Sequence, residues 1–280
     1  MGVRKPFLIF TSAAVALLAV ISVEPELPAS AAVIAGYTVV SSAVTVPADS
    51  QTPGSVSCPA NELPVGGGAY TSLTFDVWLN TSQPLSNGWY VVVDDETTSP
   101  VVSDTYVVCA NKPKHYVVES STSDNPPNSY AYGLATCPKT APAVLGGGAG
   151  SSSNVAGEVS LQDAFPNRDS KYDFHAASNN QSPADNTLTT YAICGSKPKK
   201  YALMSSAAPG SLPAGSIGSA QTLCPGTTRP LGGGPAPNGP YDIDYSVSQT
   251  YPSGGSWQAA ENNGSATGTI LNVNVACAAT

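Results

Sequence analysis

Charged side chains are scarce in this 280-residue chain, in which Lys, Arg, Asp and Glu together account for 11% of the residues. The few charges are also unbalanced, with 11 basic and 19 acidic residues and a formal net charge of -8 at pH 7. An acidic surface with few lysines repels phosphate backbones and anionic lipid headgroups. We therefore expect no nucleic-acid partner and, for the mature protein, no membrane partner.

Long helices are disfavoured as well, because the chain contains 26 Gly and 25 Pro. Both residues break helices, and the abundant Ser, Thr and Asn compete for helical backbone hydrogen bonds. Short segments rich in Val, Thr and Tyr lie between turn signals such as "SNG", "PNG" and "PSGG". This pattern is typical of β-strands, so the sequence predicts an all-β fold.

Only one long uncharged apolar run is present, from Pro6 to Val23, and two basic residues precede it. Small residues follow at 29–32, in the place where a signal peptidase cleaves. The pattern predicts a signal peptide at 1–32 and a secreted, extracellular protein. An uncleaved N-terminal anchor is the alternative, since a run of about eighteen residues can barely span a bilayer.

The rest of the chain consists of three related segments, at 33–112, 113–197 and 198–280. Each has a tyrosine-led strand ("YTVVSS", "YVVESS", "YALMSS"), then a Cys-Pro, a triple glycine, a strand built on an aromatic residue and a second cysteine. Such repetition indicates one supersecondary unit used three times. The linkers "NKPKHY" and "SKPKKY" are short, so we expect the repeats to pack together as one β domain.

The first repeat is expected to hold strands near 37–46, 54–58, 63–70, 75–82, 88–95 and 104–110. In the third repeat, "YDIDYSVSQ" alternates in the manner of a half-exposed strand, with Tyr241, Ile243 and Tyr245 on one face. We expect the repeats to pack with pseudo-threefold symmetry, as in a β-prism. Three tandem small β-sandwich units are the alternative.

Six cysteines are present, two in each repeat. Six cysteines allow fifteen pairings, and the repetition selects the one in which each repeat closes on itself. The predicted disulfides, between neighbouring strands, are Cys58–Cys109, Cys137–Cys194 and Cys224–Cys277. Zinc is a poor alternative, because the sequence contains no C-x2-C pair.

The pattern C-P…GGG…(S/T)-x-P…W…N…Y-x-V-C-A resembles a repeat found in many secreted proteins of high-GC Gram-positive (actinobacterial) bacteria, most of them without an assigned activity. The second repeat departs from it, with Phe174 at the position of Trp89 and Trp257. Three cysteine-bounded repeats with a central glycine strand are also similar, at the level of the fold, to the β-prism of vitelline membrane outer layer proteins. That likeness implies no function.

The triple glycines are interpreted as structural. A phosphate-binding loop requires G-x-x-x-x-G-K-[ST] before a helix, and no lysine follows any of the three trios. Glycine inside a strand marks a bulge or a close backbone approach. The predicted structural glycines are Gly66, Gly67, Gly68, Gly146, Gly147, Gly148, Gly232, Gly233 and Gly234.

No catalytic motif stands out. The two histidines, His115 and His175, are interpreted as surface or half-buried residues rather than triad members. The carboxylates at 94–96, 242 and 244 could serve a hydrolase, but Asn179-Asn180 and Asn262-Asn263 match Asp94-Asp95, which favours turn chemistry. Three glycosylation-type sequons, at Asn80, Asn180 and Asn263, are interpreted as polar turns.

Trp78 in "FDVWLN" does not recur in the other repeats, and it is the candidate ligand-contacting residue. The sequence therefore predicts a secreted, non-catalytic binding or surface-structural protein without cofactor or metal. Its partner would be a glycan, a cell-envelope polymer or another secreted protein. Two alternatives stay open: a protein-interaction module, such as a coat component or protease inhibitor, and a carboxylate-based hydrolase with acidic residues of different repeats in one cleft.

Overall fold

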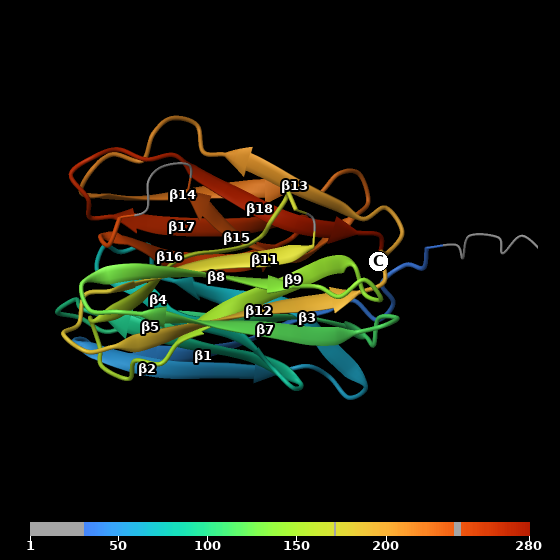
Figure 1. Cartoon of the computed structure of the whole chain (residues 1–280), viewed down its shortest axis with the longest axis horizontal. Coiled ribbons are helices and arrows are strands. Elements are labelled where there is room, and N and C mark those ends of the chain that lie inside the picture. The colour runs from blue at the N-terminus through green and yellow to red at the C-terminus, as the bar shows by residue number, and fades with distance from the viewer. Residues whose placement is uncertain (1–30, 171, 238–241) are drawn as a thin grey trace, which may run out of the picture. The chain divides into compact units, whose positions relative to one another are not determined.

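The computed structural model describes residues 31–170, 172–237 and 242–280, and Ala31–Thr280 form one compact unit (Figure 1). The described residues form 18 strands and no helix, which confirms the predicted all-β fold. No helix in this part of the chain has the length and apolar character needed to cross a membrane. Residues 1–30 of the predicted signal peptide lie outside the described residues.

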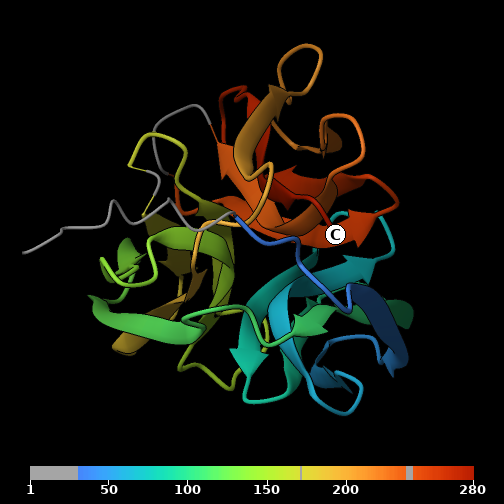
Figure 2. The same cartoon turned by 90° about the vertical axis from the view of Figure 1, so that its right-hand side faces the viewer.

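Each repeat contributes six strands, which Figure 2 shows as three groups coloured from blue through green to red. The first repeat holds β1 (Thr38–Val46), β2 (Ser50–Ser57), β3 (Glu62–Thr71), β4 (Val77–Leu85), β5 (Gly88–Asp95) and β6 (Val101–Asn111). The second holds β7 (Val117–Asn125), β8 (Ser129–Thr136), β9 (Ala143–Ser151), β10 (Val159–Pro166), β11 (Asp173–Asn180) and β12 (Asn186–Gly195). The third holds β13 (Ala202–Ala207), β14 (Ser216–Leu223), β15 (Arg229–Pro237), β16 (Tyr245–Ser253), β17 (Ser256–Asn263) and β18 (Leu271–Ala278).

All three repeats pair their strands in the same way. The first, sixth and third strands form one antiparallel group, and the second, fifth and fourth form another. The expected strands of the first repeat all occur, and the second begins earlier than predicted because Pro53 is tolerated in β2, an edge strand. In the third repeat β16 begins only at Tyr245, so "YDIDYSVSQ" is not one strand; its Tyr241 lies outside the described residues.

Backbone pairing connects the first repeat to both of the others. β3 pairs with β16 at Ala69 and Thr250, and β4 pairs with β9, where Ser82 faces Ala149. These junctions create two six-stranded sheets, β1-β6-β3-β16-β17-β14 and β2-β5-β4-β9-β12-β7. Two three-stranded sheets remain, β10-β11-β8 and β13-β18-β15.

The prediction of a β-prism with pseudo-threefold symmetry is therefore wrong: the chain forms four sheets, and no backbone pairing joins β10 to β15 among the described residues. Pro235 stands in β15 where Ala69 and Ala149 stand in the other repeats, and proline has no N–H to donate. β15 is an edge strand of its sheet, which is where proline is tolerated. Fully separate sandwich units do not describe the fold either, because two sheets continue from one repeat into the next.

The triple glycines lie where backbones approach each other too closely for any side chain. A Cβ atom on Gly66 would lie 2.7 Å from the Cα of Gly232, and a Cβ atom on Gly232 would lie 2.5 Å from the Cα of Gly146. The first glycines of the three repeats therefore meet one another. The last glycine of each trio lies against a backbone carbonyl of the neighbouring repeat, as Gly68 does against Thr250.

The middle glycine of each trio packs against the aromatic ring of its own repeat. The three pairs are Gly67 with Trp89, Gly147 with Phe174 and Gly233 with Trp257. All three rings are completely buried. The Trp89 and Trp257 indoles donate hydrogen bonds of 3.0 and 2.8 Å to the hydroxyls of Ser82 and Thr250. Phe174 has no N–H, and the position equivalent to these hydroxyls holds Ala164, so donor and acceptor are absent together.

The three predicted disulfides are confirmed, with Cα–Cα distances of 5.6 to 5.7 Å. Their place differs from the prediction in one respect. Cys58 directly follows β2 and Cys109 lies in β6, and these strands belong to different sheets. Each disulfide thus connects the two sheets of a repeat rather than two neighbouring strands.

The ends of each repeat are fastened to another repeat. The Tyr37, Tyr116 and Tyr201 hydroxyls donate hydrogen bonds to backbone carbonyls of the third, first and second repeats, at Pro230 (3.0 Å), Pro64 (2.8 Å) and Val144 (2.7 Å). The two ends of the compact unit also meet. The Ile34 N–H donates to the Ala279 carbonyl (2.8 Å), and the Ala279 N–H donates to the Lys199 carbonyl in the second linker (2.9 Å).

Candidate functional site

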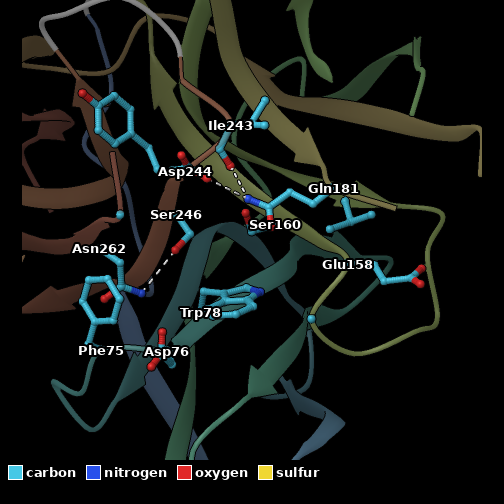
Figure 3. Close-up of a pocket in the computed structure, with 14 residues that line it drawn as sticks. Phe75, Asp76, Trp78, Glu158, Ser160, Gln181, Ile243, Asp244, Ser246 and Asn262 are labelled. Atoms are coloured by element: carbon cyan, nitrogen blue, oxygen red, sulfur yellow. Dashed lines mark hydrogen bonds between the residues drawn. The ribbon is translucent and has the colours of Figure 1, made fainter. Parts of the chain in front are cut away.

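A small cavity lies at the end of the strands where segments of all three repeats meet (Figure 3). Its volume is about 170 Å³. The segments that precede β4, β10 and β16 form its wall, together with the ends of β11 and β17. Its lining combines apolar side chains with polar ones: Phe75, Trp78, Ile243, Ser160, Gln181, Ser246 and Asn262. Apolar walls with a few convergent polar groups are typical of sites for small ligands.

One carboxylate from each repeat borders this cavity, namely Asp76, Glu158 and Asp244. The three residues are equivalent, because each directly precedes the fourth strand of its repeat. In each case the backbone carbonyl accepts a hydrogen bond from the residue after the fifth strand: Asp76 from Glu96 (3.0 Å), Glu158 from Gln181 (2.8 Å) and Asp244 from Gly264 (2.9 Å). The same local geometry thus brings one acidic residue from each of three distant sequence segments to the cavity wall, although the Glu158 carboxylate points away from Trp78 (Figure 3).

Trp78 is a residue at which the repeats differ inside the cavity. It is the second residue of β4, and the second residues of β10 and β16 are Ser160 and Ser246. The indole ring is half-buried and lies among the lining residues (Figure 3). Its Nε1–H is buried and makes no hydrogen bond of ordinary geometry to any described residue. The structure therefore places the predicted ligand-contacting residue in a concave site.

Asp94 faces Trp78 in register across β4 and β5. In the other repeats this position holds Asn179 and Asn262, whose amides donate to backbone carbonyls at the start of the next repeat's strand: Asn179 to Tyr245, and Asn262 to Val77 (3.1 Å). A carboxylate cannot donate such a bond. In the first repeat Asn80 supplies the bond instead, donating to the Val159 carbonyl (3.2 Å). Asp94 is thereby left without the structural role of its counterparts.

The Asp94 side chain is completely buried, and neither carboxyl oxygen accepts a hydrogen bond of ordinary geometry. Burial raises the pKa of Asp94 to about 7, and nearby donors on Gln51, Trp78 and Gly157 only partly oppose that effect. The carboxyl does not line the cavity. It therefore cannot transfer a proton directly to a ligand there.

Asp95, Asn180 and Asn263 carry out the turn chemistry that the sequence predicts. The Asp95 carboxylate accepts a hydrogen bond from the Thr97 N–H (2.8 Å). The Asn180 and Asn263 side-chain oxygens accept hydrogen bonds from N–H groups two residues on, at 2.9 and 3.1 Å. Asn80 is different, because it is the extra residue of a β-bulge in β4 and is buried. The prediction of a polar turn is wrong for Asn80.

Neither histidine takes part in this cavity. His115 is exposed in the linker before β7, 3.0 Å from the Ser196 hydroxyl. The His175 ring nitrogen lies 3.2 Å from the Asp163 carboxylate, which is completely buried. Asp242, the other acidic candidate of the third repeat, accepts a hydrogen bond from the Asp244 N–H (3.1 Å) and does not line the cavity.

Within the described ranges, no three His, Cys, Asp or Glu side chains are grouped so that they could hold a metal ion. Comparison with protein-family models gives no match, and comparison with curated proteins gives none either. The chemistry of the cavity therefore has to be argued from its own residues.

Sequence reasoning missed the equivalence of Asp76, Glu158 and Asp244. Asp76 follows the last glycine of its trio by eight residues, whereas Glu158 and Asp244 follow theirs by ten. The bulged strand gives the correct alignment, because the residue before it is acidic in all three repeats. The signal was thus present, but the different loop lengths concealed it.

Proposed function

We propose that this protein is a non-catalytic binding module that takes one neutral or amino-bearing sugar unit of a glycan into the Trp78 cavity. The carrying observation is the convergence of Trp78 with polar side chains of all three repeats in one concave site. Aromatic faces stack on the C–H surfaces of sugars, and the Gln, Asn and Ser groups offer partners for hydroxyls. The volume of about 170 Å³ suits a single sugar or a chain end rather than an extended polymer.

The charge of the site narrows the ligand class. Asp76, Glu158 and Asp244 border the cavity, and the chain carries a formal net charge of -8. Like charges repel an anionic ligand as it enters, most strongly at low ionic strength. Phosphorylated and uronic-acid polymers are therefore disfavoured among cell-envelope polymers, and neutral or amino sugars are favoured.

A panel of neutral, N-acetylated and acidic oligosaccharides, each titrated against the purified protein by calorimetry, tests this proposal. We expect binding in the neutral or amino-sugar classes and a loss of at least tenfold in affinity for Trp78→Ala, about 1.4 kcal/mol. The matched control is Tyr172→Ala, which removes an exposed aromatic ring away from the cavity. Equal affinities for both variants, or binding of the acidic glycans alone, would contradict the proposal.

A second function is favoured by the three carboxylates at the cavity. A pair of carboxyl groups on opposite sides of a glycosidic bond is the usual machinery of glycoside hydrolysis. The hydrolase alternative requires acidic residues of different repeats in one cleft, and Asp76, Glu158 and Asp244 meet that condition. Release of reducing ends from the same oligosaccharides would support it if Asp76→Asn, Glu158→Gln or Asp244→Asn abolished the activity. Intact oligosaccharides after prolonged incubation would contradict it.

We also propose that the protein acts outside the cell after cleavage of the predicted signal peptide. Disulfides form and persist in oxidising compartments, so the three disulfides of this chain support an extracellular location. N-terminal sequencing of the protein recovered from culture medium tests this proposal. A mature start near residue 33 is expected, whereas recovery with the cell membrane and an intact N-terminus would favour the anchor.

A further inference from the structure

Trp78, which lines the cavity, and Asp94, which does not, both differ in residue type from their counterparts in the other repeats. The two residues are opposite each other in register. Both carboxyl oxygens and the indole N–H are buried, and none of the three makes a hydrogen bond of ordinary geometry within the described ranges. The indole is nevertheless close enough to Asp94 to lower the pKa of its carboxyl. A buried polar group left unsatisfied destabilises the fold, so such a group calls for an explanation.

A segment of the second repeat covers this pair. The Gln51 amide in β2 donates to the Val155 carbonyl (3.4 Å), which fastens the segment between β9 and β10 to the first repeat. Gly157 in the same segment lines the cavity, has a φ of 74° and lies so close to Glu96 that a side chain would overlap its carboxylate. Glycine adopts this φ at little cost, whereas a residue with a side chain would be strained there.

We propose that Asp94 is a positioning residue of the cavity, whose ionised carboxylate accepts hydrogen bonds from the Trp78 indole and the Gly157 backbone N–H and so fixes one wall. Protonation of Asp94 removes the negative charge that attracts both donors and releases the ring and the covering segment. Sugar binding in the cavity thus depends on whether the Asp94 carboxyl is ionised. The expected effect of Asp94 on sugar affinity rests on the proposed function. The effect of Asp94 on the cavity wall can be tested without a ligand.

The surroundings of Asp94 place the ionisation of its carboxyl near neutral pH. Gln51 from β2, Trp78 from β4 and Gly157 from the covering segment present donors to the carboxyl, and the Glu96 carboxylate opposes its ionisation. Asp49, Asp76 and Asp95 act in turn on Glu96 and, with burial, raise the pKa of Glu96. With a pKa of about 7, Asp94 is neutral at pH 6 and charged at pH 8.

The first test follows indole fluorescence of the ligand-free protein from pH 5 to pH 9. Trp89 and Trp257 are buried and hydrogen-bonded to hydroxyls, so a transition near pH 7 is expected to come from Trp78 and to vanish in Trp78→Phe. Asp94→Asn, which installs the residue of the other two repeats, is expected to abolish the transition as well. A wild-type protein without a transition, or one that persists in Asp94→Asn, overturns the inference.

Far-UV circular dichroism checks that Asp94→Asn keeps its fold. A second variant, which keeps Asp94, tests the same contact independently. Trp78→Phe removes one donor, and we expect the Asp94 carboxyl carbon, followed by NMR, to titrate at a higher pH in this variant. An unchanged titration shows that the indole does not contact the carboxylate and contradicts the inference.

The second test measures the affinity for the best oligosaccharide of the panel at pH 6 and pH 8. If only the ionised form binds, the apparent affinity falls about tenfold at pH 6, in proportion to the competent population. Asp94→Asn should show no such pH dependence. A fluorescence transition without any sugar binding leaves the inference about Asp94 standing and contradicts the proposed function. Sugar binding with the same affinity at pH 6 and pH 8 supports the proposed function and contradicts the inference about Asp94.

Discussion

At the scale of single residues, the three positions of each glycine trio have different neighbours. The first glycine meets glycines of the other repeats, the second meets an aromatic ring and the third meets a neighbouring carbonyl. Interiors are packed so closely that one added methyl group is felt. The trio is therefore a requirement of packing, as the sequence predicts, rather than a ligand-binding loop.

Gly67→Ala is expected to prevent folding or to lower its yield severely. Its new Cβ atom would overlap Cγ and Cδ2 of the Trp89 ring, and the ring has no free space to move into because it is completely buried. The matched control is Gly255→Ala, since nothing lies within 4 Å of the Cβ atom added there. Oxidative refolding, followed by counting free thiols, measures both. Complete disulfide formation in Gly67→Ala would show that the packing argument is wrong.

Glu261 in β17 makes the free energy of unfolding depend on pH. Burial and the nearby Asp163 carboxylate raise the pKa of Glu261 well above its usual value, and neither Glu261 oxygen has a hydrogen-bond partner. A carboxyl group whose pKa is raised in the folded state stabilises the protein below the unfolded pKa of about 4.5. That contribution is lost as the pH rises through the folded pKa.

Glu261→Gln should therefore match the wild type near pH 4 and exceed its free energy of unfolding at pH 8 by about 1–3 kcal/mol. Urea unfolding at several pH values between 4 and 8 measures the difference. Glu119→Gln, at a partly exposed position in β7, serves as the control and should follow the wild-type curve. Parallel curves for wild type and Glu261→Gln would contradict the argument.

At the scale of elements, the repeats are connected by two kinds of contact. Backbone pairing connects β3 to β16 and β4 to β9, whereas none joins β10 to β15 among the residues that the structure describes. The tyrosine bonds are present at all three junctions. At the junction between β10 and β15, the Tyr201 bond is therefore present without backbone pairing beside it, and we expect it to contribute more there.

Tyr116→Phe removes one of these bonds and leaves the Pro64 carbonyl without its partner. A loss of about 1 kcal/mol in the free energy of unfolding is expected, since a hydrogen bond contributes about 0.5–1.5 kcal/mol. Tyr172→Phe, an exposed position, should leave it unchanged. Tyr201→Phe, which acts at the unpaired junction between β10 and β15, should cost more than Tyr116→Phe. Equal losses for the two variants would show that the missing pairing does not matter.

At the scale of the whole molecule, repetition was the strongest signal in the sequence. It predicted the disulfides, the equivalent aromatic residues and most strand positions, because each observation is made three times. The unequal third junction was also visible, as the proline in "GGGPAP", but its meaning depends on which strand stands beside β15. The cavity could not be predicted, because it is formed by segments near residues 76, 158 and 244 that only the folded chain brings together.

The hydrogen bond between Ile34 and Ala279 has a consequence for chain connectivity. The two ends of the compact unit lie side by side, next to the second linker. A short covalent connection between them would therefore resemble the linkers that connect one repeat to the next. A circularly permuted chain, closed between Ala279 and Val33 and opened in "NKPK", would keep every strand, disulfide and junction. Adjacent termini are what such rearrangement requires. Any of the three repeats could therefore be synthesised first without changing the architecture.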